Sequence, residues 1–337
     1  MLPCRCTTPR RLVPSPRPII DPPDRVPRPP EPTCTAERSS DNDPRELPRQ
    51  PPHARPPMSG PRAGRGGAPR SPELSVAPDV FELPGAARRH LSAGQAVCIW
   101  NPYATATWRI ARRSGDPLYL KAGYASAYPS LSGERDRLRW LRERGAPVPE
   151  VVDYGSADGV EWLVTLAIAG EPATSERHLA DPRATVRAIA EGLRAFHAID
   201  PAGCPFDHSV EATLAHIRRR MAREDIDTAG FHHEHQDLTV EAAYQELMQT
   251  RPASEDLVVT HGDYCFPNVF LQAGRVVGFL DVGETGLGDR WRDLAVATWS
   301  VGWNVGPGFE DDFLEAYGAG LDAARRDFYR LLYDLES

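Results

Sequence analysis

Three polar side chains at close spacing mark the part of the chain best suited to chemistry. His261, Asp263 and Asn268 form the pattern H-x-D-x-x-x-x-N, and Asp281 begins a following D-x-G. Transfer of a phosphoryl group from ATP needs one group that orients the attacking hydroxyl and others that hold metal ions on the phosphates. Carboxylate and amide oxygens suit Mg²⁺. The pattern therefore predicts ATP-dependent phosphoryl transfer, with Asp263 as the catalytic residue and Asn268 and Asp281 as Mg²⁺ ligands.

Apolar runs on both sides of these residues predict the elements that position them. Residues 258–260, 269–271 and 276–280 are strand-like, with a glycine turn before the third run. The sequence thus predicts strand, loop, strand, turn and strand, with Asp263 and Asn268 on the loop and Asp281 at the end of the last strand. Any one of these residues alone fits a polar hairpin equally well, whereas all of them in register favour a catalytic loop.

The composition singles out Lys121, because it is the only lysine in a chain that is rich in arginine. A compact ammonium and a planar guanidinium are chemically distinct, so a position that keeps lysine suggests a specific need. Lys121 ends a predicted strand, 118–121, and Glu134 lies early in a predicted helix whose N-cap is Ser132. A lysine and a glutamate in this arrangement predict the ion pair that positions the phosphates of ATP. Glu134 alone could equally be a solvated side chain.

The remaining elements divide the chain into three segments. We predict strands at 95–100, 105–111 and 162–168, with the glycine-free loop 101–105 over the phosphates and the backbone of Ile168 near adenine. Beyond Gly170 apolar residues recur at helical spacing, and further helices are predicted at 289–301 and 325–335. The predicted boundaries are a nucleotide-binding part, 76–168, and a catalytic and acceptor-binding part, 169–337.

Residues 1–75 hold more than half of the 34 prolines and almost no periodic apolar pattern. Such a segment buries too little surface to offset its ordering entropy, so we expect it to be disordered. A proline-rich docking arm is an alternative function for it. Translation from Met58 is another possibility, which would leave most of the segment out of the native protein.

Charge and cysteine usage exclude several classes of protein. The formal net charge of −8 argues against nucleic acid as a partner. No apolar run is long enough to span a membrane, and the six cysteines show no C-x-x-C pair or zinc spacing. We therefore expect a cytoplasmic protein without membrane association or disulfides. The histidines of 231–235 have no fixed partner spacing, so no metal site is predicted there.

With these residues assembled, the chain resembles the aminoglycoside phosphotransferases, most of all the 3′-phosphotransferases that act on kanamycin and neomycin. The resemblance covers roughly 80–337 and is firmest at 256–281, 288–290, 204–207 and 328–332. It implies an α+β, two-lobed protein-kinase-like fold with a small β-rich N-lobe and a larger, mainly helical C-lobe. It also implies ATP and Mg²⁺ as cofactors, an aminoglycoside as the small-molecule acceptor, 3′-hydroxyl phosphorylation and antibiotic resistance.

The same resemblance suggests which residues contact the acceptor. Acidic groups in the family's matching segments contact the drug's amino groups, and here Glu234 is the acidic residue retained near 231–234. Asp334 and Glu336 are the candidates in the tail. Glu284 stands where the family usually has an arginine. The tentative acceptor residues are therefore Glu234, Glu284 and Asp334.

Two other functions stay open at this stage. A choline- or sugar-type metabolic kinase of the same fold would share Asp263, Asn268 and Asp281, and acidic residues could hold a quaternary ammonium. A non-catalytic pseudokinase is the other alternative, although every catalytic residue is present. A protein kinase is disfavoured, because the interval between Asp281 and the helix predicted at Asp289 is too short for an activation segment.

Overall fold

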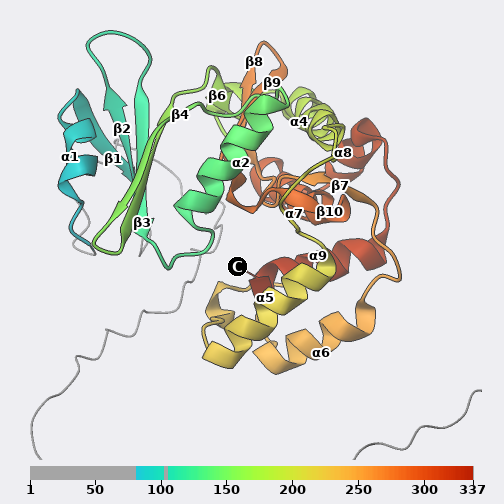
Figure 1. The fold of residues 1–337 in the computed structure, drawn as a ribbon. Coiled ribbons are helices and arrows are strands. Elements are labelled where there is room, and N and C mark those ends of the chain that lie inside the picture. Colours follow the sequence, from blue (N-terminus) through green and yellow to red (C-terminus); the bar gives the residue numbers. More distant parts are fainter. Residues whose placement is uncertain (1–80, 102–104, 337) are drawn as a thin grey trace, which may run out of the picture. The chain divides into compact units, whose positions relative to one another are not determined.

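The computed structural model describes residues 81–101 and 105–336 (Figure 1). Two predictions lie wholly or partly outside them: the proline-rich segment 1–75 with its candidate start at Met58, and most of the loop 101–105. Within the described residues, strands dominate up to Leu166 and helices dominate beyond Ser175.

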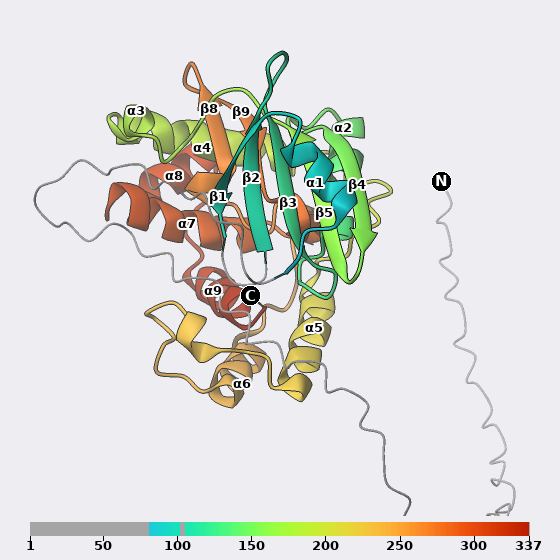
Figure 2. The ribbon, with the colours of Figure 1, turned by 90° about the vertical axis from the view of Figure 1, so that its left-hand side faces the viewer.

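The first part of the chain forms a five-stranded antiparallel sheet in the order β1-β2-β3-β5-β4, seen face-on in Figure 2. The strands are β1 (Gln95–Trp100), β2 (Thr105–Ala111), β3 (Leu118–Tyr124), β4 (Val151–Ala157) and β5 (Val160–Leu166). Lys121 lies in the central strand, where it faces Thr107 on β2 and Leu163 on β5.

Strand pairing determines the bounds of β3 and β5, which differ from the predicted ones. β3 runs to Tyr124 instead of ending at Lys121, because its last three residues pair with the first three of β5. β5 covers Val160–Leu166 instead of 162–168, so Ile168 lies beyond the strand. The apolar pattern located both strands, and the ladder between them decides where each ends.

One helix packs on each face of this sheet. Helix α1 (Gly85–Leu91) contributes Ala87 to an apolar cluster with buried side chains of β1, β2, β3 and β5. Helix α2 (Leu131–Glu143) packs on the other face, where Leu138 and Leu141 join the main core with Leu163 (Figure 1). The N-cap of α2 is Ser130 rather than the predicted Ser132, since the Ser130 side chain accepts the Gly133 N–H at 3.1 Å.

The rest of the chain is mainly helical. Its helices are α3 (Glu176–Leu179), α4 (Pro182–His197), α5 (Val210–Arg223), α6 (Val240–Thr250), α7 (Trp291–Val305), α8 (Glu310–Tyr317) and α9 (Ala323–Glu336). Their apolar stripes meet in the main core, which includes Ile189 and Leu193 of α4 and Leu294 of α7. Helix α7 is buried over most of its length and packs against α8 and α9.

Two small sheets carry the residues with catalytic spacing. One has the order β6-β8-β9, from β6 (Glu171–Pro172), β8 (Val269–Gln272) and β9 (Arg275–Phe279). The other pairs β7 (Leu257–Thr260) with β10 (Gly286–Asp289). The predicted helix at 289–301 therefore begins at Trp291, because the residues before it form a strand on β7 that the glycine-rich sequence did not indicate.

No helix among the described residues is long and apolar enough to cross a membrane. The cysteines in this part of the chain, Cys98, Cys204 and Cys265, are free thiols.

Candidate active site

The loop after β7 holds the Asp263 carboxylate in a fixed orientation. The short 3₁₀ helix Phe266–Asn268 brings Asn268 back toward Asp263. The Asn268 side-chain N–H₂ donates to the main-chain oxygen and to Oδ2 of Asp263, both at 3.0 Å. These two acceptors fix which end of the amide faces Asp263, so the Asn268 amide oxygen is the atom left for other ligands.

A buried carboxylate on α7 anchors this loop from below. Asp293 accepts the backbone N–H groups of His261 at 2.7 Å and of Gly262 at 2.8 Å, and its Oδ2 lies 2.8 Å from His197 Nε2. Burial opposes ionisation of Asp293, yet the hydrogen bonds from His197 and the loop backbone hold its pKa below the usual value. Asp293 is therefore a charged anchor, and it orients the loop without facing the solvent.

Gly262 is required where the loop turns. Its φ of +92° lies in the region that favours glycine, and a Cβ there would lie 2.6 Å from Cβ of Glu284 and 2.7 Å from its carbonyl oxygen. The neighbouring His261 is fully buried, and burial lowers the pKa of its imidazole, which keeps it neutral. Its Nδ1 accordingly accepts the backbone N–H of Asp263 at 3.3 Å.

Asp281 lies just beyond β9, in a left-handed backbone conformation with φ 52° and ψ 47°. This conformation is uncommon for a residue with a side chain, and such strain is concentrated at functional sites. The Asp281 side chain is 51% exposed, and its Oδ1 lies 2.6 Å from Lys121 Nζ. A carboxylate that is half exposed and reached by a lysine suits the binding of a hard cation or of phosphate groups beside it.

Lys121 connects the sheet to this region. Its Nζ lies 2.9 and 3.1 Å from the two carboxylate oxygens of Glu134 on α2, in addition to its contact with Asp281. Burial disfavours the ammonium, but the two carboxylates raise the pKa of Lys121 above its ordinary value. The lysine is therefore a held cation, and three predicted residues from β3, α2 and the segment after β9 come together.

Helix α2 is fixed against the segment that follows Asp281. The Arg137 guanidinium donates to the carbonyl oxygen of Thr285 at 2.6 Å. Gly283 packs against Pro129, where a Cβ would lie 3.0 Å from the proline ring, and within ordinary contact distance of Glu134. These contacts set the distance between Glu134 and Asp281, and thus the position of the lysine between them.

Ile168 lies between the sheet and β6, and its side chain packs on Gly278 of β9. A Cβ at Gly278 would lie 2.2 Å from Cδ1 of Ile168, so that packing requires glycine. The backbone N–H of Ala167 donates to Pro117 at 2.9 Å. Among the hydrogen bonds of residues 105–336, none involves the backbone of Ile168.

The predicted acceptor residues differ in accessibility. Glu234 is 36% exposed at its side chain and accepts from Trp299 Nε1 at 3.0 Å and from Arg330 at 3.1 Å. Asp334 and Glu284 are each only 4% exposed. The structure therefore gives Glu234 direct access to solvent and places the other two carboxylates in the interior.

Two histidines from the segment 231–235 enclose Asp334. His235 Nδ1 lies 2.6 Å from Oδ2, and His232 Nδ1 lies 2.5 Å from Oδ1. The His232 ring also stacks on Trp299 and Trp303, with centroid distances of 3.9 and 4.9 Å. No group of three or more His, Cys, Asp or Glu side chains in the described parts of the chain could hold a metal ion. These histidines are thus a structural clamp on the last helix.

Sequence reasoning missed two residues of the site, Asp293 and Tyr333. The Tyr333 hydroxyl donates to Asp263 Oδ1 at 3.0 Å from the last turn of α9. Asp293 had a detectable signal, an acidic residue within an apolar helix. Tyr333 had none, because its contact depends on how α9 packs against a loop far away in the sequence.

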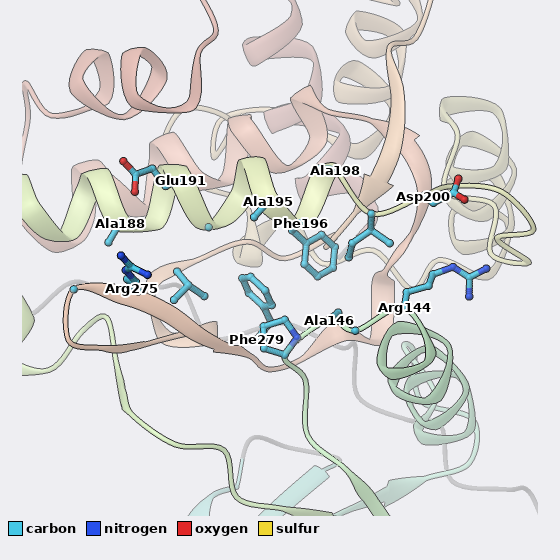
Figure 3. Close-up of a pocket in the computed structure, with 16 residues that line it drawn as sticks. Arg144, Ala146, Ala188, Glu191, Ala195, Phe196, Ala198, Asp200, Arg275 and Phe279 are labelled. Atoms are coloured by element: carbon cyan, nitrogen blue, oxygen red, sulfur yellow. The ribbon is translucent and has the colours of Figure 1, made fainter.

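A separate cavity of about 630 Å³ lies between α4, β9 and the turn after α2 (Figure 3). Its lining includes Phe196, Phe279, Arg144 and Arg275. None of the residues with catalytic spacing lines it.

Comparison with known proteins gives three kinds of match. A sequence model of the phosphotransferase enzyme family matches residues 102–329. An aminoglycoside 3′-phosphotransferase of Streptomyces fradiae is 42% identical over 210 residues, which is 60% of this chain and 78% of the relative.

Two solved structures share the fold. A crystal structure of a type VIII aminoglycoside-3′-phosphotransferase is 33% identical with a TM-score of 0.66, covering 74% of this chain and 99% of that one. An aminoglycoside phosphotransferase, APH(3″)-Id, from Streptomyces rimosus, in complex with ADP and streptomycin, is 28% identical with a TM-score of 0.60, over 69% and 90% of the two chains. The predicted α+β, kinase-like fold is confirmed.

Proposed function

Because the chain belongs to the phosphotransferase enzyme family, we propose that it transfers the γ-phosphoryl group of ATP to a hydroxyl of an aminoglycoside, the 3′-hydroxyl being favoured, and so confers resistance. The observation that carries this proposal is the paired geometry of Asp263 and Asn268 on one loop. Relatives named as aminoglycoside 3′-phosphotransferases support the acceptor, and a relative solved with ADP supports the nucleotide.

Asp263 acts on the acceptor. Its carboxylate accepts the proton of the attacking hydroxyl, or orients that hydroxyl toward the γ-phosphorus. The Asn268 amide and the Asp293 anchor hold the carboxylate before the acceptor arrives, so little reorganisation is needed during the reaction. The loop therefore contributes mainly preorganisation.

Lys121 acts on the nucleotide. Its ammonium, held by Glu134, contacts the α- and β-phosphates. Asn268 and Asp281 fit a hard cation, because one offers an amide oxygen and the other a half-exposed carboxylate. Mg²⁺ bound by these two residues would neutralise charge on the phosphates.

The lobe boundaries follow from the same proposal. Residues 76–168 make the nucleotide-binding lobe and 169–337 the catalytic and acceptor-binding lobe, with adenine at the backbone of Ile168. One apolar cluster supports this division, since it gathers side chains of the sheet, of α1 and of the segment before it. The main core crosses the boundary, because it includes Leu138 and Leu141 of α2 and Leu163 of β5 together with the helices beyond residue 169.

For the acceptor, we assign direct contact to Glu234 and indirect roles to Asp334 and Glu284. An amino group of the drug needs an accessible carboxylate, and Glu234 is the most exposed of the three. Arg330 already neutralises part of its charge, so Glu234 alone is a weak anchor. Asp334 holds His232 in place beside Trp299, where the acceptor would meet an aromatic surface.

A coupled assay of ADP release against kanamycin, neomycin, streptomycin, choline and a macrolide tests the proposed acceptor. We expect turnover with kanamycin and neomycin that requires Mg²⁺ and is lost in Asp263→Ala. Turnover with choline and with none of the other four compounds would show that the acceptor is a metabolite and not an aminoglycoside. ADP release with none of the five in a correctly folded protein would contradict the proposal.

A further inference from the structure

The Tyr333 hydroxyl makes the contact that an acceptor hydroxyl needs. It donates to Asp263 Oδ1 at 3.0 Å, while the Asn268 amide lies 3.0 Å from Oδ2. A general base must lie within about 2.6–3.2 Å of the group whose proton it takes. Tyr333 satisfies this distance with the residue assigned above as the base.

Packing holds Tyr333 in this position. The next residue, Asp334, is bound by His232 and His235, and Glu336 near the end of the helix is bound by Arg292 and His208. The end of α9 is thus fixed by four charged or polar contacts to other elements. The tyrosine hydroxyl is therefore held at the base by the fold and does not depend on a flexible terminus.

The ring of Tyr333 lies at the edge of the aromatic surface on the acceptor side. Its centroid is 6.0 Å from that of His232 and 6.3 Å from that of Trp299. The tyrosine consequently occupies the region between Asp263 and the residues assigned to the acceptor. An aminoglycoside hydroxyl that binds Oδ1 of Asp263 would compete with the phenol for this oxygen.

From this geometry we infer that Tyr333 is a self-phosphorylation site, modified by the protein's own active site when no acceptor is bound. The inference rests on the proposed function, because it uses the same base and the same nucleotide. Tyr333 Oη forms a bond to the γ-phosphorus of ATP as the bond between that phosphorus and the β–γ bridging oxygen breaks. The electron pair of the broken bond leaves with ADP, and the phenolic proton passes to the Asp263 carboxylate.

The modification blocks the site that produced it. A phosphotyrosine carries nearly two negative charges, and here they lie beside the carboxylate of Asp263 in the position of the acceptor. Protein incubated with ATP alone therefore loses acceptor turnover in proportion to the phosphate on Tyr333. We expect a bound aminoglycoside to protect Tyr333, because its hydroxyl and the phenol would compete for the Asp263 carboxylate.

The test incubates the full-length protein with ATP and Mg²⁺ without acceptor and maps phosphate by tandem mass spectrometry. We expect phosphate on Tyr333, formed at a rate per molecule that does not change with protein concentration, and suppressed by kanamycin. Asp263→Ala should slow it by about 10²-fold or more. Tyr333→Phe should abolish phosphate at this position.

Tyr329→Phe is the matched control, because it removes a hydroxyl from the same helix. The Tyr329 hydroxyl is buried and makes no hydrogen bond to the described residues, so this variant should keep both activities. Unmodified Tyr333 after incubation with ATP and Mg²⁺ without acceptor, in a preparation that phosphorylates kanamycin when kanamycin is added, would overturn the inference and leave the proposed function standing. Phosphorylation of Tyr333 in Asp263→Ala at the rate of the wild type would also overturn the inference alone, because another kinase would then be the source of the phosphate. Loss of both activities in the wild type would overturn both proposals.

Discussion

At the scale of single residues, the site depends on groups that the catalytic pattern does not contain. Asp293 is fully buried, yet it accepts two backbone N–H groups of the loop that carries Asp263. The spacing of His261, Asp263 and Asn268 predicts their chemistry, whereas nothing in that spacing predicts which helix supports them. Lys121 could be identified because it is the only lysine in the sequence. Glu134 could be identified because it lies early in the charged helix that follows the strand of Lys121.

Replacement of Lys121 by arginine tests the role of the ammonium. Lys121 lies within 3.1 Å of oxygens on both Glu134 and Asp281, a position that suits a compact cation. We expect Lys121→Arg to lower kcat by about 10²- to 10³-fold, in the range seen when one preorganised electrostatic group is lost. The melting temperature should stay close to that of the wild type. Turnover near the wild-type value in Lys121→Arg would show that charge alone is sufficient.

At the scale of elements, helix α2 determines how Glu134 meets Lys121. Its N-cap is Ser130, which precedes the serine that the sequence suggested by two positions. Both serines precede the apolar stripe at acceptable spacing, so the pattern cannot separate them. The structure distinguishes them: helix α2 begins at Leu131, so Ser132 lies inside it, and the backbone N–H of Ser132 donates to Glu161 of β5.

Alanine substitution at the two serines separates these assignments. Ser130→Ala removes the acceptor of the Gly133 N–H and should lower the free energy of unfolding by about 1 kcal/mol. Ser132→Ala should have a smaller effect, since the bond of its hydroxyl to the Ser130 hydroxyl caps no backbone N–H of the helix. Urea unfolding of both variants provides the measurement. A larger loss of unfolding free energy in Ser132→Ala than in Ser130→Ala would show that Ser132 is the N-cap.

The end of helix α9 makes the stability of the fold dependent on pH. Burial opposes ionisation of Glu336, but Arg292 and His208 lower its pKa to about 2. The pKa of a glutamate in an unfolded chain is about 4.3. The ionised side chain therefore contributes its full stability above about pH 4.3, and that contribution is lost as the pH falls from there through about 2.

Glu336→Gln measures this contribution. At pH 7 the variant should be less stable than the wild type by about 3 kcal/mol, because it leaves Arg292 buried without its partner. The difference in unfolding free energy should narrow as the pH falls below about 4. Glu211→Gln, which disrupts an exposed pair with Arg218 and Arg251, is the control and should change little. A difference that stays constant from pH 7 to pH 3 would contradict the assignment.

At the scale of the whole molecule, the sequence predicted the α+β class and the order of strands before helices. Strands β1 and β2 have the predicted bounds, because turn residues bracket an apolar run in β1 and an alternating pattern in β2. The strand β10 and the start of α7 were not predicted, because a glycine-rich segment becomes a strand only through pairing with β7. The same limit applies to Tyr333, whose contact with Asp263 joins residues far apart in the chain.

The most direct test of the central claim compares the wild type with Asp263→Asn in the conversion of kanamycin and ATP. Asparagine keeps the size of the side chain, but its amide cannot accept the hydroxyl proton as a carboxylate does. The wild type should form one phosphorylated aminoglycoside and one ADP per turnover, measured by mass spectrometry and coupled ADP release. Asp263→Asn should lower kcat by about 10²- to 10⁴-fold at an unchanged melting temperature. A kcat for Asp263→Asn close to that of the wild type would contradict the claim that Asp263 is the catalytic residue.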